Sequence, residues 1–590
     1  MASISDYIPP GIRFLAKTAL PTVSALAAIT VGAPLLLKVQ APTWLLIVTG
    51  VFFYPISFLA SVYYRDYKKR QTARSLGAVL PNQVEHKLPA GIDIVMQMSD
   101  DLANRYPVYR FFEWPEKYGH TYNVRALFDD RIFTCDPEYL KIILATEFNK
   151  YEKGPLLREQ QRVFLGNGVF NADGEMWKFH RIMSRPFFSR DRVGHFDIFD
   201  RIADTVISQI KARFKEGYPI DLQESLSRFM LDSSTEFLFG SNVNSLSVGL
   251  SYPPSSEKGR NAPVPTHPSY AFGDSFMELQ KIIIVRTFYG EAWPLSEFWR
   301  DKVLDHMKVM DAFVVPVTQK ALEKKAEAEK ASTEEKGKNE SESLMEHLVK
   351  SSDDVKVIKD EALNILLAGR DSTAAAITFV VYMLSEHPEI LKRLRAEILE
   401  TVGMSRPDYD DIKRMKYLRA VINETLRLYP PIPLNMKQAK NDIVLPPLDP
   451  EGKPIFIAAG TRVQFSVMVM HRRKDLWGPD AHEFDPDRWL DERLNKYLTP
   501  NPSIFLPFSA GPRVCLGQQF AYNAISFMLI RILQQFGSVQ LVQHEANPDA
   551  VPPPGWAESK GSNGKDKVKL RSYLTLFVDG GLWVKMDQAD

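Results

Sequence analysis

A short glycine-bracketed loop near the C-terminus carries one of the chain's two cysteines. The loop reads Phe508-Ser509-Ala510-Gly511-Pro512-Arg513-Val514-Cys515-Leu516-Gly517, and a stretch typical of a helix, Gln518 to Gln535, follows it at once. Gly511 and Gly517 let backbone N–H groups approach the sulfur, and the following helix N-terminus also favours a thiolate. A lone cysteine is more often only a small buried side chain. In this loop, however, Cys515 is suited to ligate a haem iron, with Arg513 in reach of a haem propionate.

A second group of reactive side chains falls in a predicted central helix. It is the run Ala368-Gly369-Arg370-Asp371-Ser372-Thr373. Gly369 is predicted to let the helix widen locally, and an acid followed by a hydroxyl side chain at such a widening could deliver protons to a bound dioxygen species. Taken alone, an Asp-Ser pair is more often part of a bent helix with a polar side. The candidate catalytic residues are Asp371, Ser372 and Thr373.

Two further pairs of residues are spaced so that their side chains lie side by side on one face of a predicted helix. Glu424 and Arg427 are three residues apart, and an ordinary surface pair at this spacing contributes ~0.3 kcal/mol. Leucine, isoleucine and proline surround this pair, which favours burial. Trp177 and Arg181 are four residues apart, so an indole N–H and a guanidinium share one face and can both meet a haem propionate.

Taken in chain order, these patterns resemble those of the cytochrome P450 superfamily from about Pro107 to the C-terminus. The matching motifs are W-x-x-x-R at Trp177, A-G-x-D/E-T at Ala368, E-x-x-R at Glu424 and F-x-x-G-x-R-x-C-x-G at Phe508. The chain departs from the family pattern at Ser372, where threonine is usual. It departs again at Lys437, where many relatives have a propionate-binding arginine.

The resemblance implies a mainly α fold with small β-sheets, a haem b cofactor and a monooxygenase reaction, which inserts one atom of O₂ into a C–H bond and reduces the other to water. It implies that Cys515 ligates the iron. The residues implied to hold the cofactor are Trp177, Arg181, Lys437, Arg513, Cys515 and Gly517. Glu424, Arg427 and Arg488 would form a buried network that fixes the cysteine loop, and breaking it would cost several kcal/mol.

Three stretches narrow the resemblance to the fungal microsomal n-alkane and fatty-acid hydroxylases. They are Ile142 to Phe148, Leu165 to Phe170 and Gly517 to Ala521. The expected substrate is a long-chain n-alkane or fatty acid, hydroxylated at or near its terminal carbon. The apolar pocket candidates are Ile365, Leu366, Ala368 and Leu434, and no charged residue is assigned to the pocket. Broad oxidation of aromatic hydrocarbons and xenobiotics is the close alternative, and a haem-thiolate isomerase, a peroxygenase or a non-catalytic haem-binding protein are others.

Electrons are expected from a separate protein, because no G-x-G-x-x-G fingerprint follows a strand and no length is left for a flavin domain. The implied partner is an NADPH-cytochrome P450 reductase, so that NADPH supplies the electrons indirectly, through this separate protein. Its docking face is predicted to carry Lys178, His180, Arg185 and Arg190. With 73 basic and 72 acidic residues, the chain lacks the charge footprint of a nucleic-acid binder.

The N-terminal residues 1–78 are predicted to be a membrane anchor. Thr18 to Leu37 and Ala41 to Tyr64 are uncharged for 20 and 24 residues, and ~20 apolar residues span a bilayer core. The first segment contains two prolines and could instead be re-entrant or interfacial. The basic cluster after Tyr64 predicts an endoplasmic reticulum protein whose remaining chain, residues 79–590, is one haem domain in the cytosol. Two cysteines cannot form a disulfide framework, which agrees with a reducing compartment.

Helical periodicity dominates the haem domain. Helices are predicted at 137–147, 176–184, 194–216, 222–239, 301–329, 360–385, 388–402, 415–428 and 518–536. Strands are predicted at 121–128, 131–134, 455–458 and 462–470, with a C-terminal hairpin of 573–577 and 582–585 around Asp579-Gly580-Gly581. Ser251 to Tyr270 and Lys324 to Ser343 are predicted to be surface insertions.

Overall fold

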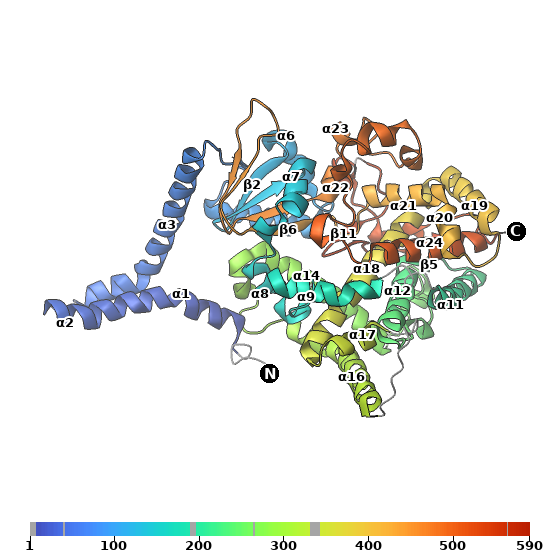
Figure 1. Cartoon of the computed structure of the whole chain (residues 1–590), viewed down its shortest axis with the longest axis horizontal. Helices are drawn as coiled ribbons and strands as arrows, with labels where there is room; N and C mark the ends of the chain where they lie inside the picture. Colours follow the sequence, from blue (N-terminus) through green and yellow to red (C-terminus); the bar gives the residue numbers. More distant parts are fainter. Residues whose placement is uncertain are drawn as a thin grey trace.

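A computed structural model describes residues 8–38, 42–188, 196–263, 266–330, 343–562 and 564–589 of the chain. Most of these residues form a helix-rich body with small β-sheets, and the first helices project from it (Figure 1). The predicted fold class, mainly α with small sheets, is therefore confirmed. Arg190 of the predicted docking face and most of the charge run between Lys324 and Ser343 lie outside the described residues.

Two long apolar helices form the N-terminal projection. Helix α1 (Pro10–Ala27) continues through a π-helical turn (Ala28–Gly32) into α2 (Ala33–Leu37), and α3 (Thr43–Ser75) runs back to the body (Figure 1). Both stretches are long and apolar enough to cross a membrane, and most of their side chains are exposed. A third helix of this kind, α18 (Val355–Glu386), is instead mostly buried, because it crosses the interior of the body.

Helix α3 does not end with its apolar stretch but continues through the basic cluster and packs on the body. Asp66 forms an ion pair with Arg125 at 2.8 Å, and Lys69 forms one with Asp130 at 2.7 Å. Both partners lie on the hairpin of β2 (Thr121–Ala126) and β3 (Asp129–Thr134). These two ion pairs join the C-terminal part of α3 to the sheet, and each partner contributes one acidic and one basic residue.

The hairpin β2–β3 belongs to a six-stranded sheet in the order β1-β2-β3-β9-β6-β4. Its other members are β1 (Asn82–Gln83), β4 (Tyr151–Glu152), β6 (Asn435–Ala439) and β9 (Arg462–Phe465). The sheet lines the cavity through β6, which includes Lys437, and through β9, which includes Gln464. The strand predicted at 462–470 is too long, because β9 ends at Phe465 and the chain continues into α22 (Val467–Met470). The hydroxyl of Ser466 caps the N-terminus of this helix.

The predicted C-terminal hairpin is wrong in its pairing. Strand β12 (Leu576–Val578) pairs with β11 (Leu570–Ser572), whereas β13 (Trp583–Lys585) pairs with β10 (Gln540–Leu541) and β5 (Ile220–Asp221). Gly580 and Gly581 both have positive φ angles, so they turn the chain from one sheet into the other instead of closing a hairpin. A further pair, β7 (Ile443–Leu445) and β8 (Ile455–Ile457), stands apart.

Helix α18 is the centre of the helical core. It packs on α12 (Leu222–Phe239), α21 (Lys416–Leu428) and α24 (Gln518–Gln535), all rich in buried apolar residues. The N-terminus of α12 is capped by the carboxylate of Asp221, and Gly240 at φ +67° ends it. The sequence predicts these helices because their apolar residues recur with helical spacing.

The remaining helices surround this core. Those that line the cavity are α4 (Ile92–Asn104), α5 (Tyr109–Glu113), α8 (Pro155–Leu165), α9 (Gly174–Ser184) and α14 (Pro268–Tyr289), whereas α16 (Val303–Lys330) packs on α14. The others are α6 (Pro115–Tyr118), α7 (Pro137–Lys141), α11 (Asp197–Lys215), α13 (Glu257–Arg260), α15 (Trp293–Ser296), α17 (Leu344–Ser351), α19 (Pro388–Val402), α20 (Tyr409–Arg414), α23 (Lys474–Trp477) and α25 (Gln543–Ala546). The predicted helix 137–147 divides into α7 and a π-helical turn, 142–146, which packs against the cysteine loop.

Candidate active site

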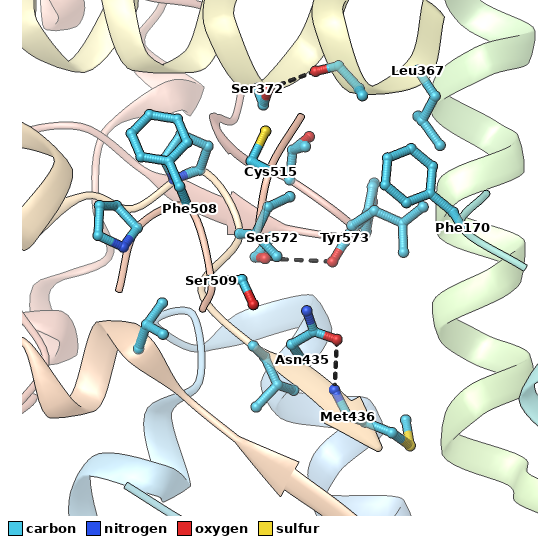
Figure 2. A pocket seen from close by; sticks show the side chains of 18 of the residues that line it. Phe170, Leu367, Ser372, Asn435, Met436, Phe508, Ser509, Cys515, Ser572 and Tyr573 are labelled. Atoms are coloured by element: carbon cyan, nitrogen blue, oxygen red, sulfur yellow. Dashed lines mark hydrogen bonds between the residues drawn. The ribbon is translucent and has the colours of Figure 1, made fainter. Parts of the chain in front are cut away.

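A cavity of about 500 Å³ lies between α18 and the cysteine loop. Its walls also include the start of strand β6, the middle of α9, the α4–α5 turn and the β11–β12 hairpin. Figure 2 shows Phe170, Leu367, Cys515 and Tyr573 among the side chains around it. Elements far apart in the sequence therefore line one cavity together with the predicted ligand cysteine.

The cysteine loop is held by its own backbone. The N–H of Cys515 donates to the carbonyl of Phe508 at 3.0 Å, and that of Val514 donates to Gly511. Gly511 has φ +64°, and a Cβ there would lie 2.0 Å from the carbonyl oxygen of Leu144. Only glycine fits this position, which packs closely against residues 142–146, while the backbone N–H that bonds to the sulfur belongs to Gly517.

Burial, a backbone N–H, a nearby cation and a helix dipole all act on the charge of the Cys515 sulfur. Burial raises the pKa of the Cys515 thiol, while the N–H of Gly517 and the nearby positive charge of Arg181 act to lower it. Gly517 also stands at the N-cap of α24, where the helix dipole favours negative charge. The thiol is exposed to the cavity although protein surrounds it. These features suit a thiolate that needs a cation as its partner.

Cationic side chains gather beside the loop. The guanidinium of Arg181 donates to the carbonyl of Val514 at 2.9 Å, and Arg513 donates to Asp173 and to the carbonyl of Ala172, both at 2.8 Å. Lys437 is only 4% exposed, and no carboxylate pairs with it among the described residues. Burial, together with nearby like charges, lowers its pKa well below the usual value.

Lys153 belongs to the same group and was missed by the sequence analysis. It lines the cavity from the turn before α8, where burial and the charge of Arg513 lower its pKa to about 8. Trp177 completes the group, with the Arg513 guanidinium 4.8 Å from its ring centre. No motif marks Lys153, since a lysine in a turn is ordinarily a solvated surface charge.

Glu424, Arg427 and Arg488 meet in a fully buried network. The Arg427 guanidinium donates to both carboxylate oxygens of Glu424 at 2.8 and 2.7 Å, and Arg488 approaches the same carboxylate at 3.4 Å. The indole of Trp489 donates to it at 3.0 Å. These cations lower the pKa of Glu424 against the effect of burial, so the carboxylate stays charged.

His471, which the sequence analysis also missed, links that network to the cysteine loop. The carbonyl of His471 accepts from Arg427, and its ring nitrogen Nε2 accepts from the N–H of Leu506 at 3.0 Å. Burial lowers its pKa to about 3, so the ring is neutral and can accept. Leu506 lies two residues before Phe508, so His471 connects the network to the start of the loop.

The acid and the hydroxyl on α18 face different neighbours. The hydroxyl of Ser372 donates to the carbonyl of Ala368 at 2.6 Å (Figure 2). Ser372 and Thr373 both line the cavity. Asp371 does not line it but accepts from the amide of Gln280 on α14 and pairs with Arg370. Burial raises its pKa. The widening predicted at Gly369 is absent, because 355–386 is one continuous α-helix.

The predicted apolar lining is partly corrected. Ile365, Ala368 and Leu434 line the cavity, but Leu366 is buried in the core and Leu367 lines the cavity instead. Residues 365, 368 and 372 share one helix face by their spacing, and residue 366 points away from it. The cavity also has charged residues at the α4–α5 turn, which the sequence analysis did not assign to it.

Comparisons with known proteins agree with this geometry. A sequence model of the family described as Cytochrome P450 matches residues 96–558. The chain belongs to the cytochrome P450 family. Cytochrome P450 52-E3 of Starmerella bombicola is 33% identical over 543 residues, covering 90% of this chain and 96% of the relative. Cytochrome P450 52A1 of Candida tropicalis is 35% identical over 506 residues, covering 83% and 84%. Cytochrome P450 monooxygenase pvhE of Talaromyces variabilis is 34% identical over 492 residues, covering 79% and 85%.

As a cytochrome P450, the protein is a haem-thiolate monooxygenase that takes electrons from a redox partner and acts on hydrophobic substrates. The cavity fits the cofactor on two counts. Lys437 is buried with no carboxylate partner among the described residues, and Arg513, although paired with Asp173, has a buried Nε without a hydrogen-bond partner there, whereas buried polar groups are normally satisfied. An anionic group such as the haem propionates supplies the missing charge, and the thiol of Cys515 faces the same space.

The predicted docking face carries less accessible positive charge than expected. His180 is completely buried on α9, with its ring 2.9 Å from the carboxylate of Glu361, so it cannot steer a partner. Lys178 and Arg185 are exposed, and Lys178 pairs with Glu175. Exposed Met176, Phe179 and Ile182 give this face an apolar part. The helical phase of α9 turns His180 inward together with Trp177 and Ser184.

Proposed function

We propose that the protein hydroxylates long-chain n-alkanes or fatty acids at or near the terminal carbon. The observation that carries the proposal is a cavity whose apolar walls lead to Cys515, including Phe170, Leu367, Ala368 and Leu434. The similarity to cytochromes P450 52-E3 and 52A1 supports the same group of hydroxylases that Ile142–Phe148 and Gly517–Ala521 resemble. A flexible hydrocarbon chain needs contact area and no fixed polar partner along its length.

In this proposal Cys515 would supply the thiolate that holds the haem iron, with Gly517 and Arg181 stabilising its negative charge. The bound haem supplies the activation of dioxygen. Trp177, Arg181, Lys437 and Arg513 bind the propionates, and we add Lys153 to them. The charge of the propionates offsets the desolvation of the buried cations. Glu424, Arg427 and Arg488 act structurally: they hold the chain that carries His471 and thereby the cysteine loop.

Ser372 and Thr373 are proposed to move protons at the cavity wall, with Asp371 as their source. Burial raises the pKa of Asp371, so its carboxyl group retains a proton more readily than an exposed aspartate. Its contacts with Gln280 and Arg370 hold it on the α14 side of the helix. A proton therefore has to pass from Asp371 around the helix to the hydroxyl of Ser372, through a rotation of the carboxyl group or through water.

The redox partner is proposed to be NADPH-cytochrome P450 reductase. It would dock on α9, where Lys178 and Arg185 steer an acidic surface and Phe179 and Ile182 provide apolar contact. Reversing both charges to glutamate is expected to slow reduction and to remove its dependence on salt. Unchanged reduction kinetics in this double variant would reject the docking face without affecting the proposed reaction.

The membrane is proposed to be that of the endoplasmic reticulum, with residues 1–78 as the anchor and residues 79–590 as the cytosolic haem domain. The support is the apolar length of α3 and the basic cluster that follows it: Arg65, Lys68, Lys69, Arg70 and Arg74. Protease treatment of sealed microsomes should digest the haem domain from outside. Protection of the domain would reverse the orientation.

The deciding experiment combines a spectrum with a substrate panel. The reduced protein with carbon monoxide should show the Soret band of thiolate-ligated haem, and Cys515→Ala should lose it. With reductase and NADPH, hexadecane and hexadecanoate should yield terminal or near-terminal alcohols, while an aromatic hydrocarbon should yield little product. Preferred turnover of the aromatic compound would replace this proposal with broad oxidation of xenobiotics.

A further inference from the structure

A second, smaller cavity of about 70 Å³ lies where the apolar helix α3 meets the body. Its walls come from the C-terminal part of α3, from β1, from the hairpin β2–β3 and from β8. Beside it, Ala73, Ala78 and Phe456 form a small apolar cluster that packs the end of α3 against β8. One water needs roughly 10–15 Å³, so the cavity has room for a polar group of several atoms.

The position of this cavity along α3 corresponds to the headgroup layer of a membrane. At about 1.5 Å per residue, the uncharged part Thr43–Tyr64 is about 33 Å long, close to the ~30 Å of a hydrocarbon core. Asp66 and Arg70 follow about 3 and 9 Å further along the helix, at the inner and outer limits of the polar layer. The sheet reaches the same layer, because the ring of Phe128 at the hairpin tip lies 5.3 Å from that of Phe58.

The walls of this cavity carry more positive than negative charge. Lys69, Arg70 and Arg125 line it together with only two acids, Asp66 and Asp130. Lys69 and Arg125 are paired with these acids at 2.7 and 2.8 Å. Arg70 is exposed and has no carboxylate partner in the described part of the chain. One guanidinium is therefore left for an anion that enters from the membrane surface.

A buried acceptor in the same wall lacks a donor. Asn123 is only 8% exposed, and its Nδ2 donates to Asp130 at 3.0 Å. Its carbonyl oxygen Oδ1 has no hydrogen-bond partner among the described residues. Buried acceptors are normally satisfied, and a hydroxyl group of a ligand can donate to this one. The cavity thus offers a cation and an acceptor together.

We propose that this cavity binds the headgroup of phosphatidylinositol, an anionic phospholipid whose headgroup carries hydroxyl groups. Arg70 donates to the phosphate, and a ring hydroxyl donates to Oδ1 of Asn123. The headgroup of phosphatidylcholine has no hydrogen-bond donor and adds a positive charge, so it satisfies neither the acceptor nor the charge of the walls.

A headgroup in this cavity touches the anchor and the sheet at once. It therefore holds α3 in one orientation relative to the haem domain, in addition to the two ion pairs. This inference goes beyond the proposed hydroxylation and does not depend on the substrate. It rests only on α3 as a membrane anchor.

The test is native mass spectrometry of the haem-loaded full-length protein in detergent micelles, titrated with three lipids. Phosphatidylinositol is compared with phosphatidylmethanol, which keeps the charged phosphodiester but has no hydroxyl, and with phosphatidylcholine. One phosphatidylinositol should be retained, about threefold more tightly than phosphatidylmethanol, the effect of one neutral hydrogen bond. Phosphatidylcholine should bind most weakly.

Two substitutions separate the charge from the acceptor. Arg70→Gln should weaken the binding of both anionic lipids about fivefold, whereas Arg70→Lys should keep most of the affinity. Asn123→Leu should weaken only phosphatidylinositol, about threefold, to the level of phosphatidylmethanol. The carbon monoxide spectrum of each variant verifies its fold. If Asn123→Leu does not fold, the ratio of the two anionic lipids on the wild type decides.

Arg74→Gln is the matched control, because it removes an exposed arginine one turn further along α3 that does not line the cavity. Its affinity for phosphatidylinositol should equal that of the wild type. Equal weakening by Arg70→Gln and Arg74→Gln would overturn the inference, since the basic cluster would then attract anionic lipids without a defined site. Equal affinity of the wild type for phosphatidylinositol and phosphatidylmethanol would also overturn it, with water as the donor to Asn123.

A soluble competitor distinguishes a lipid from a free ligand. Glycerophosphoinositol, the headgroup without its acyl chains, should displace little phosphatidylinositol at equal concentration. Equal competition would identify a soluble ligand and overturn the inference. None of these outcomes bears on the proposed hydroxylation. Release of the protein from vesicles by alkaline carbonate would reject the anchor and this site together.

Discussion

Two parts of the cavity wall carry cationic side chains: the cysteine end, at the cysteine loop and β6, and the α4–α5 end, at residues 101–110 and Arg571. At the cysteine end, Lys437 is buried with no carboxylate partner in the described part of the chain, and Arg513 pairs with Asp173 but has one buried Nε without a hydrogen-bond partner. At the α4–α5 end, Arg110 and Arg571 have carboxylate partners and Arg105 is exposed. A buried unpaired cation is costly until an anion joins it, whereas a paired or exposed one is not. Lys437 therefore makes the cysteine end the part of the wall that gains most from an anionic ligand.

The largest expected contrast is in the carboxylates that support the two ends. Glu424→Gln leaves Arg427 and Arg488 buried without their common partner, and it should lower the free energy of unfolding by about 3–5 kcal/mol. Asp101→Asn removes the partner of Arg110 where solvent can compensate, and it should change stability by less than about 1 kcal/mol. Urea unfolding of the haem-loaded proteins measures both. Similar losses of unfolding free energy in the two variants would show that solvent compensates the loss of Asp101 no better than that of Glu424.

In the second contrast, one substitution, Lys437→Met, should stabilise the haem-free protein but weaken haem binding in the loaded one. Lys437→Met removes a buried cation that lacks a partner, so the haem-free protein should gain about 1–2 kcal/mol of stability. With haem bound, the same substitution removes a propionate partner, and haem transfer to apomyoglobin should become about tenfold faster. Lys178→Met, on the exposed face of α9, serves as the control and should change neither quantity. Destabilisation of the haem-free protein by Lys437→Met would refute the assignment.

Much of the cysteine end could be predicted from the sequence, because its residues fall in motifs with fixed spacing. Cys515, Glu424 and Trp177 follow this rule, and the helical period brings Arg427 and Arg181 to their neighbours. Lys153 and His471 could not be predicted in this way. Each is brought to the site by tertiary packing between elements far apart in the chain, and no local pattern marks either of them.

The wrong predictions also arise because helical phase and tertiary packing, which no local pattern shows, decide which side chains face the cavity. His180 was predicted on the surface because its neighbours are basic, but the helical phase that buries Trp177 buries it too. Leu366 was predicted in the cavity because it is apolar, although it is out of phase with Ala368. The α4–α5 end was not predicted at all, since Arg105 and Arg571 lie far apart in the chain and meet only through the fold.

The pH dependence of stability should distinguish the haem-free protein from the loaded one. The pKa of Lys153 is about 8 in the folded haem-free chain and 10.5 as the ordinary value. The unfolded state therefore binds more protons between these values, and stability should rise as pH increases from 8 to 10.5. We expect a gain of about 1–2 kcal/mol, reduced from the full shift because the side chain is partly exposed.

The control for this prediction is Lys153→Met, whose unfolding free energy should lack that part of the rise. Haem binding supplies an anion and restores the ordinary pKa, so the loaded wild type should also lack it. A rise that persists unchanged in Lys153→Met would assign the pH dependence to other groups. The same rise in loaded and haem-free protein would mean that no propionate lies beside Lys153.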